Sequence, residues 1–400
     1  MKIVTVSELG EVVTGHTPPT SKREYYGDYI PFVKPTDISV DSKYTYEPEE
    51  YYSQLGYEKY RKSLIPKGAT CIVCIGTLGE KMTMSACDCF TNQSINTIIP
   101  NEKYNNEYVY YLLKYNLHKV KARNRGTASG REFVSKSSFL GMELEVHEDV
   151  AIQRKIGKIL SSYDDLIENN QKQIKLLEEA AQRLYKEWFV DLRFPGHKTT
   201  PITDGIPQGW KNSEVSDFGE VVTGKTPSTA NAEYYGGNIP FVKIPDMHNR
   251  VFPVTTEVCL TKEGADTQKN KYIPRNSLMV SCIATVGLVN IALEECQTNQ
   301  QINSVILHNE QDLYFIYFTL KQMKSLLDGV GSNGATMTNV NKTKFGKIPV
   351  VCPSEDLRSA FYEWVEPVFR KIENLSRNII ALQEARDSLL PKLMNGEIEV

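Results

Sequence analysis

The sequence predicts an α/β (α+β) fold that is built twice, with the two copies separated by two long helices that pair as an antiparallel coiled coil. Three observations lead to this prediction. Residues 9–38 match residues 218–247 at roughly two positions in three, with an offset of 209, which indicates an internal duplication. Each copy contains short β-like runs between Gly, Pro and Asn, and each copy closes with a long segment of heptad period.

The β-like runs occupy corresponding positions in the two copies. In the first copy they cover residues 29–33, 69–75 and 94–99, and in the second copy residues 238–242, 278–283 and 302–307. Helical segments are expected over residues 107–120 and 311–327. The mixture predicts, in each half, a domain with an irregular sheet and a few helices.

Two matching apolar stripes predict the long helices, one over about 149–190 and the other from Ser354, a typical N-cap residue, to about Asn395. Their apolar positions alternate three and four residues apart, which keeps one stripe on a helix face. In the first helix the stripe is Leu160, Tyr163, Ile167, Asn170, Ile174, Leu177, Ala181, Leu184 and Trp188. In the second helix, at an offset of 205, it is Val365, Val368, Ile372, Leu375, Ile379, Leu382, Arg386, Leu389 and Leu393.

Mutual pairing is the arrangement that buries both stripes without another partner. Because a repeated unit commonly closes through a two-fold axis, we expect the pair to be antiparallel, with a domain at each far end of a spacer of roughly 60 Å. The alternatives are that each helix packs on its own domain, or that the stripes bind another protein. The expected divisions are 1–148, 149–194 (first helix and junction), 195–209 (linker), 210–353 and 354–400 (second helix and tail).

Composition narrows the class of protein. A formal charge of -3 and a pI near 6.2 argue against coating nucleic acid by bulk attraction, so any DNA site must be local. No run of eighteen apolar residues and no basic leader followed by an apolar stretch occurs, which predicts a cytoplasmic protein without membrane contact. The cysteines are therefore expected to be reduced thiols.

Residues 219–226, GEVVTGKT, satisfy the P-loop pattern, which makes a nucleotide hydrolase the first rival class. The context disagrees, because no apolar strand precedes the pattern, no helix follows it, and the other copy carries His16 where Lys225 stands. We interpret the segment as a glycine turn.

Cys71, Cys74, Cys87 and Cys89 suggest a zinc site, but the second copy keeps only Cys282 and Cys296 near those positions, so buried thiols are favoured and no metal is expected. Nuclease and methyltransferase motifs are also absent from the sequence, which favours a binding role without catalytic residues.

The repeated motifs resemble those of the specificity subunits of type I restriction-modification systems over essentially the whole chain. Each copy carries Val-Thr-Gly-x-Thr-Pro, then Tyr-Tyr-Gly-x-x-Ile-Pro-Phe-Val-Lys, then Thr-Asn-Gln-x-Ile-Asn. Residues 187–196, EWFVDLRFPG, are similar to the central junction of the family, and residues 394–398, MNGEI, to its ending. One departure precedes the first helix, where residues 148–153 keep only Gln153 of the family's usual Pro and Glu-Gln.

The resemblance implies a non-catalytic DNA-binding subunit with one target recognition domain in each half, each recognising one part of a split, asymmetric site in double-stranded DNA. The helices would fix the spacing and dock two modification (methyltransferase) subunits, and restriction (endonuclease/translocase) subunits would complete the complex. S-adenosylmethionine, ATP and Mg would be used by those partners, with no cofactor on this chain. A coiled-coil scaffold without DNA contact is the second rival.

Residues that differ between the copies are the candidates for DNA contact, because shared residues do not explain two different half-sites. Asn92-Gln93 and Asn299-Gln300 are accordingly interpreted as turn-forming scaffold. The basic loop of the first copy supplies Lys119, Lys121, Arg123, Arg125, Arg131 and Lys136, and its counterpart supplies Asn333, Asn339, Asn341, Lys342 and Lys344. Secondary candidates beside tyrosines are Lys59, Arg61, Lys62, Lys269 and Lys271. The alternative for each residue is an ordinary solvated surface charge.

Overall fold

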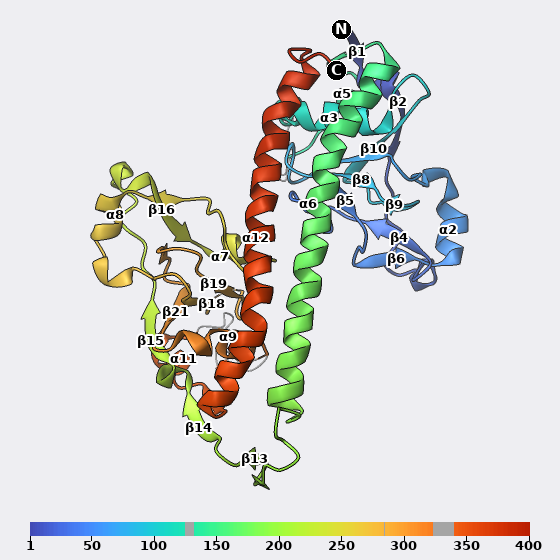
Figure 1. The fold of residues 1–400 in the computed structure, drawn as a ribbon. Coiled ribbons are helices and arrows are strands. Elements are labelled where there is room, and N and C mark those ends of the chain that lie inside the picture. The colour runs from blue at the N-terminus through green and yellow to red at the C-terminus, as the bar shows by residue number, and fades with distance from the viewer. Residues whose placement is uncertain (125–131, 284, 323–339) are drawn as a thin grey trace. The chain divides into compact units, whose positions relative to one another are not determined.

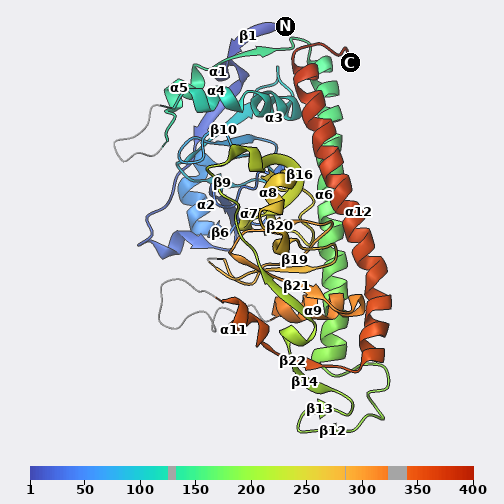
Figure 2. The same cartoon turned by 90° about the vertical axis from the view of Figure 1, so that its left-hand side faces the viewer.

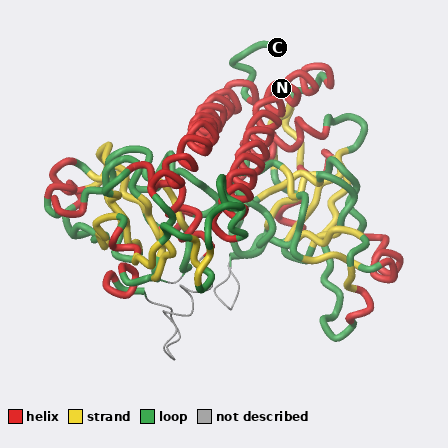
Figure 3. Tube along the Cα trace, turned by 60° about the horizontal axis from the view of Figure 1, so that its bottom comes forward, coloured by secondary structure: helices red, strands yellow, loops and turns green. Residues whose placement is uncertain are grey.

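The computed structural model describes residues 1–124, 132–283, 285–322 and 340–400. The chain divides into two compact units. Unit 1 comprises Met1–Asn169 and Ala381–Val400, and unit 2 comprises Asn170–Ile380. Both units combine strands with helices (Figure 3), and each is described by itself.

The larger sheet of unit 1 has the strand order β2-β10-β7-β8-β5, and four of its strands, β2, β10, β8 and β5, are labelled in Figure 1. Its strands are β2 (Gly10–Thr14), β10 (Ile95–Pro100), β7 (Thr70–Val73), β8 (Met82–Ser85) and β5 (Tyr44–Thr45). Neighbouring strands are antiparallel except β5 and β8, which are parallel. Every residue of β7 and β8 is buried, so these strands lie in the core of the unit.

A second sheet in unit 1 has the order β3-β6-β4-β9 and carries an aromatic cluster. Its strands are β3 (Tyr26–Gly27), β6 (Glu50–Tyr52), β4 (Ile30–Val33) and β9 (Phe90–Thr91). Tyr52 stacks on Phe90 with ring centroids 4.6 Å apart and also packs against Phe32. β6 is followed by the short helix α2 (Gln54–Tyr60), whose first turn Ser53 caps at the Gly56 amide, and by the 3-10 turn η2 (Arg61–Ser63).

The remaining helices of unit 1 are α1 (Val6–Leu9), α3 (Asn106–Tyr115), α4 (Leu117–Ala122) and α5 (Lys136–Leu140). Strand β1 (Lys2–Thr5) pairs with β11 (Glu143–Val146), the last strand before the first long helix. The helical segment expected over residues 107–120 is formed by two helices, α3 and α4. Asn116 ends α3, because its backbone leaves the helical region and its side-chain amide donates to the Leu112 carbonyl.

Unit 2 repeats this arrangement. The sheet order β15-β21-β18-β19 corresponds to β2-β10-β7-β8, with β15 (Gly219–Thr223), β21 (Ile302–Leu307), β18 (Leu278–Ser281) and β19 (Val289–Ile291). A smaller sheet has the order β17-β16-β20, with β17 (Cys259–Leu260), β16 (Tyr235–Val242) and β20 (Gln297–Thr298). β14 (Lys211–Glu214) pairs with β22 (Pro349–Cys352) as β1 pairs with β11. The duplication predicted from the sequence is therefore a duplication of structure.

Most helices of unit 2 also follow the repeat, except at residues 244–247, whose counterpart in unit 1 is a turn. The longer helices of unit 2 are labelled in Figure 2. The helices described in unit 2 are η4 (Val215–Asp217), η5 (Ala232–Tyr234), α7 (Ile244–Met247), α8 (Lys262–Asp266), η6 (Lys269–Lys271), η7 (Glu310–Asp312), α9 (Leu313–Gln322) and α11 (Lys342–Gly346). The linker holds the hairpin of β12 (Ile202–Thr203) and β13 (Ile206–Pro207). α9 corresponds to α3, and its residues 313–320 are buried.

The long helices are α6 (Val150–Tyr185), which a π-helical turn continues over Lys186–Val190 (η3), and α12 (Glu355–Met394). In unit 1 the first part of α6 packs against the last part of α12. Leu160 shares a buried cluster with Leu390 and Leu393, and His147, just before α6, contacts the Leu393 carbonyl. Asp164 binds Arg386. Because residue numbers rise along α6 as they fall along α12, the pairing is antiparallel.

In unit 2 the last part of α6 packs against the first part of α12 in the same sense. Trp188 lies 5.9 Å from Phe361, centroid to centroid. Nearer the middle of α6, Glu178 accepts from Tyr317 of α9, and the Tyr317 ring contacts Phe369. The antiparallel pairing predicted from the stripes is thus found within each unit. Every residue predicted for the stripes is buried or half-buried.

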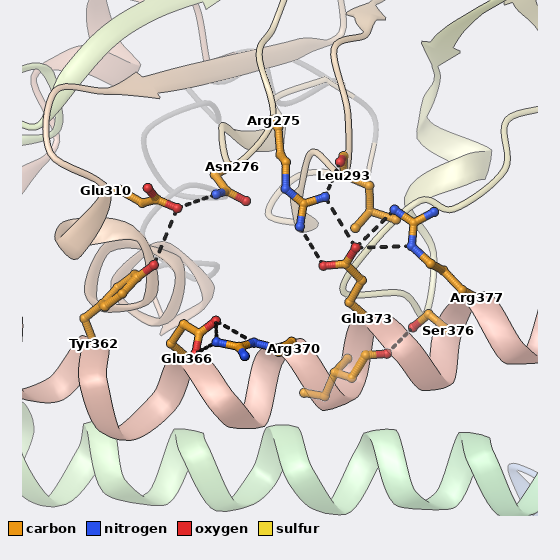
Figure 4. Close-up of polar contacts among 11 residues, drawn as sticks. Arg275, Asn276, Leu293, Glu310, Tyr362, Glu366, Arg370, Glu373, Ser376 and Arg377 are labelled. Atoms are coloured by element: carbon orange, nitrogen blue, oxygen red, sulfur yellow. Dashed lines mark hydrogen bonds and ion pairs between the residues drawn. The ribbon is translucent and has the colours of Figure 1, made fainter.

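Polar contacts also tie α12 to the sheet side of unit 2 (Figure 4). Arg275 donates to the Leu293 carbonyl and to the Glu373 carboxylate, which also accepts from Arg377 one turn further along α12.

None of the helices in the described part of the chain has the length and apolar character needed to cross a lipid bilayer.

Candidate nucleic-acid interface

Unit 1 contains an open groove of about 750 Å³ between β2, the segment from α2 to η2, and the start of α5. Its basic lining residues are Lys59, Arg61, Lys62 and Lys136, and all four are exposed. Glu11 and Glu58 are the acidic residues of the lining. The groove therefore brings Lys136 of the predicted basic loop together with the secondary candidates that stand more than seventy positions earlier.

His16 and Tyr60 line this groove together. Their ring centroids lie 4.8 Å apart, and the His16 backbone is held by hydrogen bonds to the Thr91 carbonyl and from the Tyr52 hydroxyl. Gly15 permits this close approach, because a Cβ there would lie 2.2 Å from the Thr91 carbonyl oxygen. Burial raises the pKa of Tyr60, so its hydroxyl stays protonated and is able to donate at neutral pH.

The corresponding residues of unit 2 have a different chemistry. Lys225 takes the position of His16, and its amide binds the Thr298 carbonyl as the His16 amide binds Thr91. Gln268 takes the position of Tyr60, and its side-chain amide donates to the Lys225 carbonyl over 2.6 Å. Lys269 and Lys271 lie in η6, and Lys342 begins α11, which are the elements equivalent to η2 and α5. The scaffold is shared, whereas the side chains presented on it differ.

The other candidates of the first basic loop lie on α4 and just after it. Lys119 donates to the Glu143 carbonyl, and Lys121 pairs with Glu80 at 3.2 Å, with the side chains of this pair about half exposed. Arg123 is the C-terminal cap residue of α4. Arg125 and Arg131 lie outside the described residues. Weak surface contacts of this kind do not prevent Lys119 or Lys121 from binding a phosphate instead.

In the counterpart loop of unit 2, Asn341 caps α11. Its side-chain oxygen accepts from the Lys344 amide at 2.9 Å, as Ser135 accepts from the Ser138 amide in unit 1. Because the cap uses the side-chain oxygen of Asn341, the donor group of this side chain is its amide NH2. Lys342 is exposed and Lys344 half-buried. Asn333 and Asn339 lie outside the described residues.

The P-loop pattern does not form a phosphate-binding loop. Gly219–Thr223 is strand β15, and its backbone pairs with β21. The next amides bind carbonyls of neighbouring strands and turns, Gly224 to Ile302 and Lys225 to Thr298, so they do not point at a ligand. Gly224 is required for close packing, since a Cβ there would lie 2.3 Å from the Thr298 carbonyl oxygen.

The shared Asn-Gln pairs serve the scaffold. Asn92 accepts from the Ser94 amide, and Asn299 accepts from the Gln301 amide, which are Asx turns. Gln93 accepts from Thr17, and Gln300 accepts from Thr226 in the same way. These contacts fasten the glycine segment of each copy to the turn before the central strand.

Three of the four cysteines near the sheet of unit 1 are packed in its interior. Cys71, Cys74 and Cys89 are buried and Cys87 is exposed. Burial raises the pKa of the Cys71 and Cys74 thiols to about 11, so both thiols are protonated at neutral pH. Among the described residues, no group of three or more His, Cys, Asp or Glu side chains is arranged to hold a metal ion.

Two features of the site do not follow from the sequence prediction. The groove itself joins segments that are distant in the chain, and no periodicity signals such a junction. The second feature is the contact of His16 with Tyr60 and of Lys225 with Gln268. The sequence does indicate that these two pairs are equivalent, because the repeat aligns His16 with Lys225 at an offset of 209 and Tyr60 with Gln268 at an offset of 208. In the sequence alone, His16 stands out only as a departure from the P-loop pattern.

The fold and the groove together define a duplicated binding protein whose two copies present different polar surfaces. Comparison with known families agrees: the type I restriction modification DNA specificity domain matches residues 1–179 and 207–383. The chain belongs to this family and is a DNA specificity subunit of a type I restriction-modification system.

Individual relatives of the chain are also specificity subunits. The chain is 36% identical over 311 residues to the type I restriction enzyme HindI specificity subunit of Haemophilus influenzae, covering 62% of this chain and 68% of that one. It is 26% identical over 407 residues to the MjaIX specificity subunit of Methanocaldococcus jannaschii, covering 99% and 93%. Among solved structures, the S subunit from M. genitalium has a similar fold, with a TM-score of 0.58, 14% identity, and coverage of 98% and 95%.

Proposed function

We propose that each copy of the recognition fold binds one half of a bipartite, asymmetric site in double-stranded DNA, using the groove of unit 1 and the equivalent surface of unit 2. One observation carries the proposal. The same fold position holds basic side chains in each copy, yet the residue beside them is His16 in one copy and Lys225 in the other. Lysine and arginine neutralise phosphates, and a change of polar side chain changes the base contacts.

The chain would have no catalytic activity of its own. Two methyltransferase subunits would dock on it, with their S-adenosylmethionine, and endonuclease subunits would add ATP- and Mg-dependent restriction. The helix pairs support this, because exposed apolar residues remain on them beyond the paired stripes, including Leu166 and Trp364, which is 70% exposed. The helices would also set the spacing between the half-sites.

The groove is tested with the full chain and a duplex that carries its recognition site, identified from the methylome of cells that express the chain with its methyltransferase. The variant replaces Arg61, Lys62 and Lys136 with Ala. The plot of log binding constant against log salt should become shallower by about 0.9 for each phosphate that is no longer neutralised.

The matched control replaces Lys67, Lys103 and Lys155 with Ala. These residues are exposed, belong to unit 1 and do not line the groove, and the same charge is removed. An unchanged slope in the groove variant, or an equal decrease in the control, would reject the groove as a DNA-contact surface.

A further inference from the structure

Unit 1 buries a polar layer between its helices. Asp164 of α6 and Arg386 of α12 form an ion pair, with 5% and 8% of their side chains exposed. The second oxygen of the Asp164 carboxylate accepts from the Tyr111 hydroxyl of α3. Burial and the charge of Asp164 raise the pKa of Tyr111, which keeps that hydroxyl protonated as a donor. Arg386 also donates to Asp387, which is more than half exposed.

The equivalent layer of unit 2 is apolar. At the helix offset of 205, Asp164 corresponds to Phe369, and Ala181 corresponds to Arg386. At an offset of 207, which aligns Tyr110 with Tyr317 and Lys114 with Lys321, Tyr111 corresponds to Phe318. Phe318 and Phe369 are in ring contact, with centroids 5.8 Å apart, and share a buried cluster with Ala181. One copy thus holds an Asp-Arg-Tyr layer where the other holds Phe-Ala-Phe.

The repeat leaves open which helix pairs with which, and the difference between the two layers determines the choice. Because the stripes of α6 and α12 match in length and spacing, α6 of one chain has the apolar pattern to pair with α6 of a second chain. In such a pair, Ala181 of the second chain would replace Arg386 opposite Asp164. A pair of two α12 helices would place Arg386 against Phe369. A pair of two α6 helices would bury Asp164 without Arg386 at two symmetric places, and a pair of two α12 helices would leave each Arg386 with only the more exposed Asp387 of its own helix as a partner.

We propose that the Asp164, Arg386 and Tyr111 layer selects the pairing partner: it directs α6 to α12 and excludes dimers held by two α6 or two α12 helices. An ion pair buried with its hydrogen bonds satisfied adds little stability, but a single buried charge without its partner is costly. Two unmatched charges disfavour a homotypic dimer by at least about a hundredfold at the energies typical of such sites. The layer therefore acts on the choice of partner more than on stability.

The test uses lysine cross-linking of the full chain. Equal amounts of ¹⁵N-labelled and unlabelled chain are unfolded together and refolded. Lys158 stands six residues before Asp164, and Lys392 six residues after Arg386, so they lie level in the α6–α12 pair. In a pair of two α6 helices, Glu187 takes the level of Lys392, and Lys186 is its neighbour. Within one chain, Lys158 and Lys186 are 28 residues apart, about 42 Å along the helix.

Two triple variants are compared with the parent. The first copies the layer of unit 2, with Tyr111→Phe, Asp164→Phe and Arg386→Ala, and the second has Tyr111→Phe, Asp164→Leu and Arg386→Leu. Folding of each is checked by circular dichroism. The parent should give the Lys158–Lys392 cross-link and no mixed-isotope Lys158–Lys186 cross-link. A folded variant should give the mixed Lys158–Lys186 cross-link, with a dimer fraction at least about tenfold above that of the parent.

Two results would overturn the proposal. One is a mixed-isotope Lys158–Lys186 cross-link in the parent, a result that does not depend on whether the variants fold. The other is a folded triple variant that stays as monomeric as the parent and shows only the Lys158–Lys392 cross-link.

Discussion

Arg275, in the turn before β18, and Glu373 of α12 form a bidentate ion pair in unit 2 (Figure 4). The guanidinium nitrogens lie 3.3 and 2.8 Å from the two carboxylate oxygens. Arg377 donates to the same carboxylate at 3.1 Å. Since the Glu373 side chain is only 15% exposed while Arg275 is 49% exposed, the carboxylate depends on its arginines more than they depend on it.

Replacing Arg275 with Ala should lower the free energy of unfolding by about 1 kcal/mol, because a partly exposed but bidentate pair lies near the upper end of surface ion pairs. Urea unfolding of the full chain, followed by tryptophan fluorescence, measures it. Arg370→Ala is the control, since Arg370 pairs with Glu366 only along the helix surface and should have a clearly smaller effect. Equal effects of the two substitutions would contradict the special role of Arg275.

The same contact predicts a dependence on pH. Burial opposes ionisation of Glu373, but the hydrogen bonds from Arg275 and Arg377 outweigh it and hold the pKa of Glu373 below its ordinary value. Its stabilising effect is therefore complete above the unfolded pKa of about 4.3 and disappears as the pH falls through the lower folded pKa. The difference in unfolding free energy between the parent and Glu373→Gln should be constant from about pH 7 to about 5 and shrink below about 4. A difference that grows on acidification would be inconsistent with a lowered pKa.

The position shared by His16 and Lys225 is expected to contribute to the difference between the half-sites. His16→Lys should strengthen binding at low salt, because it adds a cation to the groove, and should raise the salt slope by about 1. It should alter base preference only in the half-site bound by unit 1. Selection from a library randomised in both halves measures this, and Lys225→His is the reciprocal control. A change of base preference in both half-sites, or in neither, would show that the residue at position 16 does not determine the specificity of unit 1.

The basic loop of the first copy is predicted to bind DNA phosphates independently of the groove. Replacing Arg123, Arg125 and Arg131 with Ala should weaken binding at every sequence tested, and the salt slope should fall by about 1 for each phosphate that the variant no longer binds. Filter binding over a series of salt concentrations measures the slope. An unchanged slope would leave Arg123 as a helix-terminal residue without a DNA role.

The spacer can be tested by insertion. Four residues added after Asn170 in α6 and four after Ile380 in α12 lengthen each helix by about 6 Å. At about 3.4 Å of DNA axis for each base pair, the preferred gap should grow by about one or two base pairs. Methylome sequencing gives the gap. A loop insertion of equal length after Gly205 is the control and should leave the gap unchanged, since Gly205 lies in the turn of the β12–β13 hairpin.

The periodic parts of this chain are accessible from the sequence because their signal is local. The stripe from Leu160 to Trp188 recurs from Val365 to Leu393, and each residue of it is buried or half-buried. The interpretation of Asn92 and Asn299 as scaffold rests on their presence in both copies, and their Asx turns agree with that role.

The features that the sequence does not predict depend on contacts between distant segments. Lys136 and Arg61 line one groove only after the sheet has folded, and no pattern in either segment indicates the other. Arg386 interrupts an apolar stripe, and its role becomes visible only with Asp164 and Tyr111 beside it. The divergence of its loop makes Asn341 a DNA candidate, whereas in the structure its side-chain oxygen caps α11.

The first and last strands of each recognition fold are hydrogen-bonded neighbours: Lys2 pairs with Val146, and Lys211 pairs with Cys352. Each recognition fold therefore begins and ends at the same place, on two paired strands. Exchange of such a segment for another with the same closing strands requires no new path through the core. New combinations of half-sites would then arise by genetic exchange of whole segments, without a series of individually tolerated substitutions.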